Sequence, residues 1–301
     1  MTLTEASDFT EAVAAVEAVT RGRLVLRRFL RRRTAVAGVF VLVLLFALAY
    51  LGPLVATWRY DELDFESFLQ PPSGTHWFGT TQTGADVYAL TMRGMQKSLV
   101  IGLLAALVGT GVAAVFGAFS GYFGGWADRL LTAGGDLALV LPSFLIIAIL
   151  SPNFRGKTWF MFVVLIGVFL WMITARVVRG LTLSLKEREF VQAATFMGVP
   201  PWKIVFRHIL PNMASFLIID YTINVGGAIL AEVGLSYFGF GIQPPDASLG
   251  TLLADGTPYA VTSPWLFHFA AGLIVVIVLS VNAIGDGLRD ALDPTSGSSR
   301  S

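Results

Sequence analysis

Long apolar runs with almost no charge dominate the pattern along this chain, and shorter polar stretches separate them. A helix needs about 20 mostly apolar residues to cross the roughly 30 Å hydrocarbon core of a bilayer. The pattern therefore predicts an all-α integral membrane protein with six transmembrane helices, because a soluble fold would have to bury six such runs in 301 residues. The six runs occupy 34–57, 98–127, 137–154, 158–175, 212–231 and 256–285.

The polar stretches divide the chain into an N-terminal segment at 1–33, a six-helix domain at 34–285 and a C-terminal tail at 286–301. Seven arginines lie within 21–33, so the positive-inside rule places the N-terminus in the cytoplasm. Six crossings return the C-terminus to that side, and the inner side then holds 16 of the 21 Lys and Arg residues. The first 20 residues are acidic and Ala-rich, unlike a secretory signal, so we expect the first helix to be an uncleaved anchor.

Three long connections interrupt the six-helix domain. We expect an outer loop at about 58–96, a cytoplasmic loop at about 179–211 and an outer segment at about 236–264. Loops of this length in a compact protein usually fold and often bind something.

The composition agrees with a membrane protein and excludes several kinds of site. Hydrophobic residues make up 55% of the chain and charged residues 14%, whereas a soluble domain carries about 25% charged residues. There are no cysteines, which excludes disulfides, thiolate catalysis and Cys-ligated metals. His76, His208 and His268 lie far apart, and none has a second ligand at metal-binding spacing. We expect His76 and His268 to be hydrogen-bonded histidines instead of metal ligands. We predict neither an enzyme nor a metal or other cofactor bound to this chain.

One stretch resembles a nucleotide site only superficially. Residues 151–158, SPNFRGKT, end in Gly-Lys-Thr, but a phosphate-binding loop needs Gly at its first position and a strand before it. Ser151 and Pro152 stand at the start here, between two apolar runs. We therefore expect no ATP site in this chain, so any ATP-driven process would need another polypeptide.

The cytoplasmic loop begins with an amphipathic pattern over 184–197. Phe190, Ala193, Ala194 and Met197 recur at helical spacing and predict one apolar stripe. Gly198 follows at the position where a left-handed residue ends a helix without strain on a Cβ atom. The first turns of this helix carry Glu187, Arg188 and Glu189.

A second short helix is predicted directly afterwards. Pro200 and Pro201 suit its first position, where the missing N–H of proline does no harm. Pro211 precedes the next membrane helix. The pair of short helices forms a re-entrant turn, lies on lipid headgroups, or docks in the groove of a partner protein. The small Ala193–Ala194 pair favours docking. The apolar face of the second helix comprises Trp202, Val205 and Phe206.

Residues 190–211, FVQAATFMGVPPWKIVFRHILP, resemble the EAA loop of ABC importer permeases. That pattern has Glu-Ala-Ala, then three residues, Gly, and further on Leu-Pro. Gln192 stands where the pattern has Glu, so an ion pair between that Glu and an ATPase is not expected here. The matching positions are Ala193, Ala194, Gly198, Leu210 and Pro211.

Further stretches extend the resemblance over most of the chain. They are similar to the second, C-type, permease of the oligopeptide and dipeptide importers. GFGIQPP (239–245) and GTLLADG (250–256) are most similar to the actinobacterial oligopeptide permeases. Ala85 departs from the family, which often has Arg at this position. The stretches are HWFGTTQTGADV (76–87), GYFGGWADR (121–129), LSLKEREFVQAA (183–194), AEVGLSYFGFGIQPPDASLGTLLADG (231–256) and GDGLRDALDP (285–294).

The resemblance implies a type I ABC importer permease fold in the cell membrane and a role in ATP-driven import of oligopeptides or dipeptides. It implies a second homologous permease subunit, two cytoplasmic ABC ATPase subunits that bind ATP and Mg, an extracellular substrate-binding protein, and no nucleic-acid partner. Some relatives of the family carry nickel, haem or glutathione, so the cargo stays open. The implied ATPase-coupling residues are Glu187, Arg188, Glu189, Phe190, Gln192, Ala193, Ala194, Met197, Gly198, Trp202 and Pro211.

Asp220 is the one carboxylate inside an apolar run, and it marks a candidate transport path. A carboxylate near a helix centre costs about 2.5–3.5 kcal/mol on insertion scales, so it should face protein or water. Asn224 shares its helical face, and Glu232 is expected at the water-exposed outer end of the same helix. A structural hydrogen bond from Asp220 to a neighbouring helix is the alternative. An ion-coupled secondary transporter that uses Asp220 and Glu232 is the rival function, although no internal repeat is visible.

Overall fold

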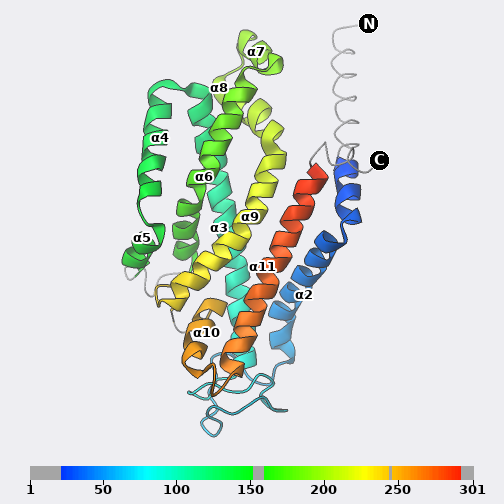
Figure 1. Ribbon diagram of the computed structural model, residues 1–301, viewed down its shortest axis with the longest axis vertical. Helices are drawn as coiled ribbons and strands as arrows, with labels where there is room; N and C mark the ends of the chain where they lie inside the picture. The colour runs from blue at the N-terminus through cyan, green and yellow to red at the C-terminus, as the bar shows by residue number, and fades with distance from the viewer. Residues whose placement is uncertain (1–21, 152–158, 244–245, 293–301) are drawn as a thin grey trace.

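The computed structural model describes residues 22–151, 159–243 and 246–292. Over these residues the protein is all-helical apart from two isolated β-bridges, which confirms the predicted fold class. Figure 1 shows five long helices running along the longest axis of the molecule. They are α2 (Arg33–Val55), α3 (Val87–Phe123), α6 (Phe160–Lys186), α9 (Ala214–Tyr237) and α11 (Trp265–Leu292). Each is long and apolar enough to cross a membrane.

The bundle centres on α3, which packs most extensively against α6 and also against α9. Glycines allow α3 and α6 to approach closely, as is common between membrane helices. A Cβ atom at Gly117 would lie 2.5 Å from the carbonyl oxygen of Ala175, and one at Gly121 would lie 2.8 Å from that of Arg179. The small residues on α3 therefore fix the spacing of the two helices.

The third predicted helix differs from its expected form. The run 137–154 predicted one transmembrane helix, but α4 (Gly125–Val140) and α5 (Ser143–Leu150) meet at an angle of 83°. Pro142 explains the break, because the residue before a proline avoids the helical region, and Leu141 is extended at φ −78° and ψ 130°. The described residues thus contain five candidate spans, or six if the bent pair counts as one.

The second predicted helix begins earlier than expected. The run of uncharged residues starts at 98, but α3 begins at Val87, where Asp86 caps the helix by accepting a hydrogen bond from the Ala89 N–H at 2.7 Å. The outer loop is correspondingly shorter than 58–96 and ends at Asp86. Arg93, which falls within the predicted loop, and Lys97 directly after it both lie on α3.

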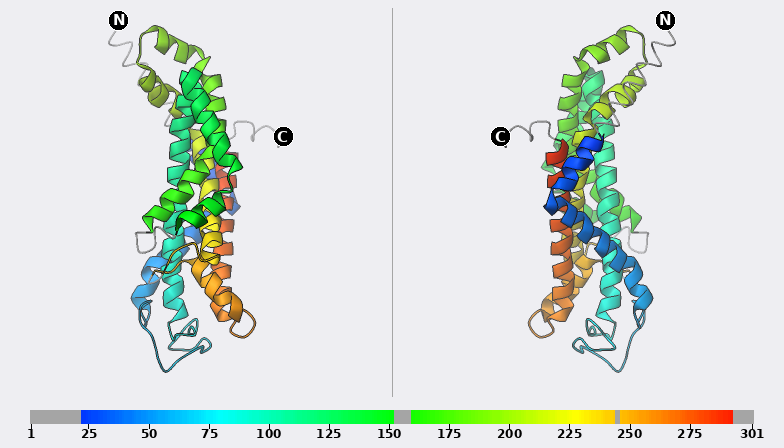
Figure 2. Two further views of the ribbon diagram at one scale, coloured as in Figure 1. Left: turned by 90° about the vertical axis from the view of Figure 1, so that its left-hand side faces the viewer. Right: turned by 90° about the vertical axis from the view of Figure 1, so that its right-hand side faces the viewer.

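The two ends of the bundle carry different structures. At one end α7 (Glu189–Phe196) and α8 (Pro201–Ile204) project beyond the long helices, and at the other lie α10 (Leu249–Gly256) and the loop before α3 (Figures 1 and 2). The start of α2 and the end of α11 lie together, joined by an ion pair between Arg32 and Asp290, and both point toward the end with α7. The predictions for residues 1–21, 152–158 and 293–301 lie outside the described residues.

Candidate functional site

The two short helices predicted between 184 and 211 are present at one end of the bundle, with one boundary corrected. Residues 184–197 do not form one helix: α6 continues to Lys186, Arg188 is extended, and α7 begins at Glu189. Gly198 has φ +74°, which confirms the predicted left-handed position. Its neighbour Val199 donates its N–H to the Ala194 carbonyl oxygen at 3.1 Å, closing the end of α7.

The second short helix begins where predicted, but its predicted apolar face is divided: Val205 is buried in the bundle, whereas Trp202 and Phe206 are exposed. Pro201 occupies the first position of α8, after the N-cap residue Pro200. A π-helical turn, Val205–Ile209, and a 3-10 turn, Leu210–Met213, then lead into α9 without a loop. Pro211 lies in this 3-10 turn, directly before the membrane helix as predicted. The helical path from Pro201 to Tyr237 is therefore continuous over 37 residues.

The inner face of the hairpin formed by 187–211 packs against the bundle. Val191 and Ala194 are buried and join one apolar cluster with Ala118 and Tyr122 of α3 and Val178 of α6. This corrects the predicted stripe, because Ala194 faces the protein's own core and cannot receive a partner's backbone. Ala193 is exposed. The other buried residues of this face are Ile204, Val205 and Ile209.

The outer face of the hairpin is apolar and open. Two of the predicted residues, Met197 and Trp202, are 75% and 55% exposed. Phe196, at 88%, was missed by the sequence reasoning because it lies off the expected stripe. Exposed apolar residues with polar residues around them mark a protein or membrane interaction site. Together the outer apolar face comprises Phe190, Phe196, Met197, Trp202 and Phe206, and we call this set the aromatic face.

The charged and polar residues of the hairpin that surround the aromatic face are exposed to solvent. Lys186 is instead fixed to the bundle, because its Nζ donates to the Tyr122 carbonyl oxygen at 2.8 Å. Gln192 donates through Nε2 to the Glu187 carbonyl oxygen at 3.4 Å, an interaction within the hairpin. The exposed polar members are Glu187, Arg188, Glu189, Gln192, Lys203 and Arg207.

Asp220 joins three helices in the middle of the bundle. Its carboxylate accepts hydrogen bonds from Thr110 of α3 and Thr174 of α6, each at 2.9 Å, and from Asn224 Nδ2 one turn along α9 at 2.8 Å. Thr110 and Thr174 are buried. The structure therefore places Asp220 and Asn224 together on one face, as predicted, and it shows the hydrogen bonds to neighbouring helices that were the alternative for Asp220.

Glu232 contradicts its prediction. It was expected at a water-exposed helix end, but its side chain is fully buried at 0% exposure. The carboxylate accepts hydrogen bonds from Ser98 Oγ of α3 at 3.0 Å and from Ser236 Oγ at 2.6 Å. Ser98 Oγ in turn accepts the N–H of Leu249 at 3.1 Å, so Glu232 ties the start of α10 to α3 and α9. The cause is that α10 and Ser248 before it pack back against the end of α9, which a helical pattern does not reveal.

Comparisons with known proteins identify the chain. The family model of the binding-protein-dependent transport system inner membrane component matches residues 113–297, which is more than half of the chain. The chain belongs to this family. A second model, the N-terminal TM domain of oligopeptide transport permease C, matches residues 20–72. The all-helical bundle is accordingly the type I ABC permease fold, and the permease carries the C-type N-terminal domain that its sequence resembles.

The permease is also similar to curated proteins over nearly its whole length. It is 55% identical over 285 residues to the oligopeptide transport system permease protein OppC of Mycobacterium tuberculosis, covering 94% of this chain and 98% of that protein. It is 37% identical to the OppC protein of Haemophilus influenzae, covering 89% and 86%. A putative peptide permease protein of Brucella suis is 38% identical, with 89% of each chain covered. These names describe permease components of transport systems and not enzymes.

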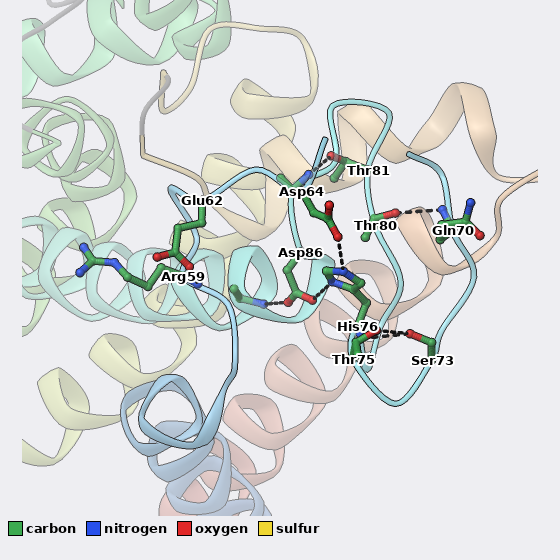
Figure 3. Close-up of polar contacts among 12 residues, drawn as sticks. Arg59, Glu62, Asp64, Gln70, Ser73, Thr75, His76, Thr80, Thr81 and Asp86 are labelled. Carbon is green, nitrogen blue, oxygen red and sulfur yellow. Dashed lines mark hydrogen bonds and ion pairs between the residues drawn. The ribbon is translucent and has the colours of Figure 1, made fainter. Parts of the chain in front are cut away.

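At the end of the permease opposite the hairpin, the loop before α3 is organised by one buried histidine (Figure 3). His76 lies between two carboxylates: Nδ1 is 2.8 Å from Asp86 Oδ2 and Nε2 is 3.3 Å from Asp64 Oδ2. The ring of Trp58 stacks on His76 with centroids 5.1 Å apart. This confirms that His76 is a hydrogen-bonded histidine, and among the described residues no cluster could hold a metal ion.

Proposed function

We propose that this permease forms half of the translocation path of an ATP-driven importer for oligopeptides in the cell membrane. A second homologous permease subunit supplies the other half, and an extracellular substrate-binding protein delivers the peptide. Two cytoplasmic ATPase subunits bind ATP and Mg and drive the cycle, while this chain binds no cofactor. The oligopeptide transport systems to which the mycobacterial and Haemophilus relatives belong support this assignment.

The hairpin at 187–211 is the surface that docks on an ATPase subunit. The observation that carries the proposal is its two-faced structure: Val191 and Ala194 anchor it in the bundle while the aromatic face stays open. A short helix with apolar anchors suits insertion into a groove of a partner protein. Because α8 continues into α9, a displacement of α8 moves the membrane helix as one body, which is how closure of the ATPases reaches the path.

The hairpin end of the bundle faces the cytoplasm in this proposal, and both termini lie on that side. Two observations support this orientation. The seven arginines of 21–33 precede α2, whose start lies toward the hairpin end, as does the end of α11 (Figure 1). The loop before α3 and α10 then face outward, where a binding protein delivers its peptide.

The ion-coupled alternative has no observation in its favour. A proton carrier must exchange with water, but Glu232 is fully buried and held by two serine hydroxyls. The carboxylate of Asp220 accepts hydrogen bonds from hydroxyl and amide donors on α3, α6 and α9. Membership of the binding-protein-dependent family also favours ATP-driven import.

The test compares two aromatic residues in the reconstituted four-subunit complex. Phe196→Ala and Trp202→Ala each remove an exposed ring from the aromatic face, so we expect weaker co-purification of the ATPase subunits and at least about a tenfold loss of ATP-driven peptide uptake, equivalent to about 1.4 kcal/mol. Phe40→Ala is the matched control, since Phe40 is 67% exposed on α2, away from the hairpin. Wild-type assembly and uptake in both hairpin variants would overturn the docking assignment.

A separate experiment tests the cargo: uptake of labelled peptides of graded length is compared with uptake of nickel, haem and glutathione.

A further inference from the structure

A cavity of about 830 Å³ lies at the end of the permease opposite the hairpin. Its walls come from 81–85 in the loop before α3, the first turn of α3, the last turn of α9, residues within 238–243 and 246–247, and α10. Tyr259 closes one side by donating its hydroxyl to the Gln82 side-chain oxygen across 177 positions of sequence. Cavities of roughly 300–1,000 Å³ hold small ligands, so this one is large enough for part of a peptide.

Two carboxylates line the cavity, and their surroundings differ. Asp246 is neutralised, because Arg93 Nη2 lies 2.6 Å and Lys97 Nζ lies 2.9 Å from its oxygens. These cations outweigh the effect of partial burial and hold the pKa of Asp246 below its ordinary value. Asp246 therefore presents no unbalanced charge to a ligand.

Asp255 presents an unbalanced charge. Within 22–151, 159–243 and 246–292 no hydrogen bond or ion pair reaches its carboxylate, and no Lys, Arg or His lines the cavity. Asp255 lines the cavity and its side chain is exposed, and partial burial of the carboxyl raises its pKa. An anion in such a position recovers its lost solvation by binding a cation.

The rest of the lining suits an organic cation with variable apolar groups attached. Aromatic rings can lie over an ammonium group and attract it through their π faces. The apolar walls offer contact without demanding one side-chain shape. The aromatic members are Tyr237, Phe238 and Tyr259, and the larger aliphatic members are Leu90, Ile242, Leu252 and Leu266.

We propose that this cavity binds a primary ammonium group of an incoming peptide, with Asp255 as its counter-charge. The α-ammonium group is the natural source, because every linear peptide with a free N-terminus carries one. A lysine side chain offers the same chemistry. The proposal rests on peptide import as the function and adds a subsite within this one chain, separate from the ATPase-docking hairpin.

The test measures direct binding to the purified complex of permeases and ATPases without the binding protein, whose own affinity would mask the effect. The probes are trialanine, N-acetyl-trialanine and N-acetyl-Ala-Lys-Ala. We expect the wild-type complex to bind trialanine at least about tenfold more tightly than N-acetyl-trialanine, a difference of about 1.4 kcal/mol. Asp255→Asn should abolish this difference by weakening trialanine alone.

Glu66→Gln is the matched control, because Glu66 is an exposed carboxylate of the loop before α3 that does not line the cavity. It should leave the preference unchanged. Tight binding of N-acetyl-Ala-Lys-Ala, lost in Asp255→Asn, would extend the site to lysine side chains, and weak binding would restrict it to the peptide N-terminus; both agree with an ammonium subsite.

The proposal is overturned if wild-type complex does not distinguish trialanine from its acetylated form, or if Asp255→Asn keeps the full difference while remaining folded by thermal unfolding. ATP-driven uptake with the binding protein present is measured on the same wild-type preparation. If uptake is intact but trialanine is not preferred over N-acetyl-trialanine, only the subsite proposal is overturned. If no peptide is taken up, the proposed function itself is overturned.

Discussion

Thr174 of α6 donates its hydroxyl to the carboxylate of Asp220 on α9 at 2.9 Å. The two residues are 46 positions apart in sequence, and their contact joins the two helices. Thr110 of α3 donates to the same carboxylate, so three membrane helices meet at one acceptor. α9 is also the helix that continues from α8 at the hairpin. Asp220 therefore holds α9 against α3 and α6.

Asp220→Ala removes the shared acceptor and leaves two buried hydroxyl donors unpaired. We expect the complex to lose about 1–3 kcal/mol of stability, seen as a lower apparent Tm in detergent. Asp220→Asn keeps one carbonyl oxygen as acceptor and should retain most of the stability and ATP-driven uptake. Loss of uptake in Asp220→Asn at unchanged Tm would contradict the structural role and return Asp220 to the candidates for ion coupling.

Ala193 and Ala194 are neighbours that face opposite ways, and they separate docking from folding. Ala193→Arg places a charged chain on the exposed surface, so we expect a normal Tm with reduced co-purification of the ATPase subunits. Ala194→Arg forces a charge into the cluster with Val191 and Ile204, so we expect a lower Tm and rapid proteolysis of the hairpin. Limited proteolysis and co-purification distinguish the two. Equal behaviour of both variants would contradict the assigned faces.

The membrane helices follow from the sequence because burial in lipid demands about 20 apolar residues whatever the tertiary packing. Gly198 and Pro201 likewise predicted the hairpin, because glycine favours the left-handed conformation that ends a helix and proline favours the first position of one. The face of α7 could not be predicted from periodicity, because Phe190, Met197 and the missed Phe196 are as apolar as the buried residues. In a short helix with apolar residues all round, only the position of α3 and α6 decides which side faces inward.

The environment of Glu232 could not be predicted from the sequence for a different reason. Its partner Ser98 lies 134 residues away, and the cover over it comes from the segment that leads into α10. The same holds for His76, whose two carboxylates are 10 and 12 residues distant in a loop without periodic structure. Such contacts depend on how loops fold over helix ends, and no local pattern encodes that.

Gly198 allows a test of backbone strain without steric complications. Its φ is +74°, and a Cβ atom added there would meet nothing within 4 Å. Gly198→Ala therefore costs only the left-handed conformation, about 1–2 kcal/mol, while Gly198→Asn should cost less because Asn tolerates this region. The expected order of hairpin protection in hydrogen exchange is Gly, then Asn, then Ala. Protection in Gly198→Ala equal to wild type would show that the turn adopts another conformation.

The loop before α3 should respond to acid through Asp64. The Glu66 N–H donates to Asp64 Oδ1 at 2.9 Å, and this bond, with help from Ser67 and His76, holds the pKa of Asp64 below its ordinary value of 3.8. The folded loop therefore binds fewer protons than the unfolded loop, so stability from Asp64 is fully present above pH 3.8 and is lost as the pH falls through the lowered folded pKa. We expect hydrogen exchange of 64–86, measured from pH 6 to pH 3 and corrected for the intrinsic rate, to rise only at the acid end. Asp64→Asn should raise exchange at all these pH values and flatten the pH dependence, with Glu66→Gln as a control that keeps the Glu66 N–H. A loop that opens equally in wild type and Asp64→Asn as the pH falls would assign the acid response to another group.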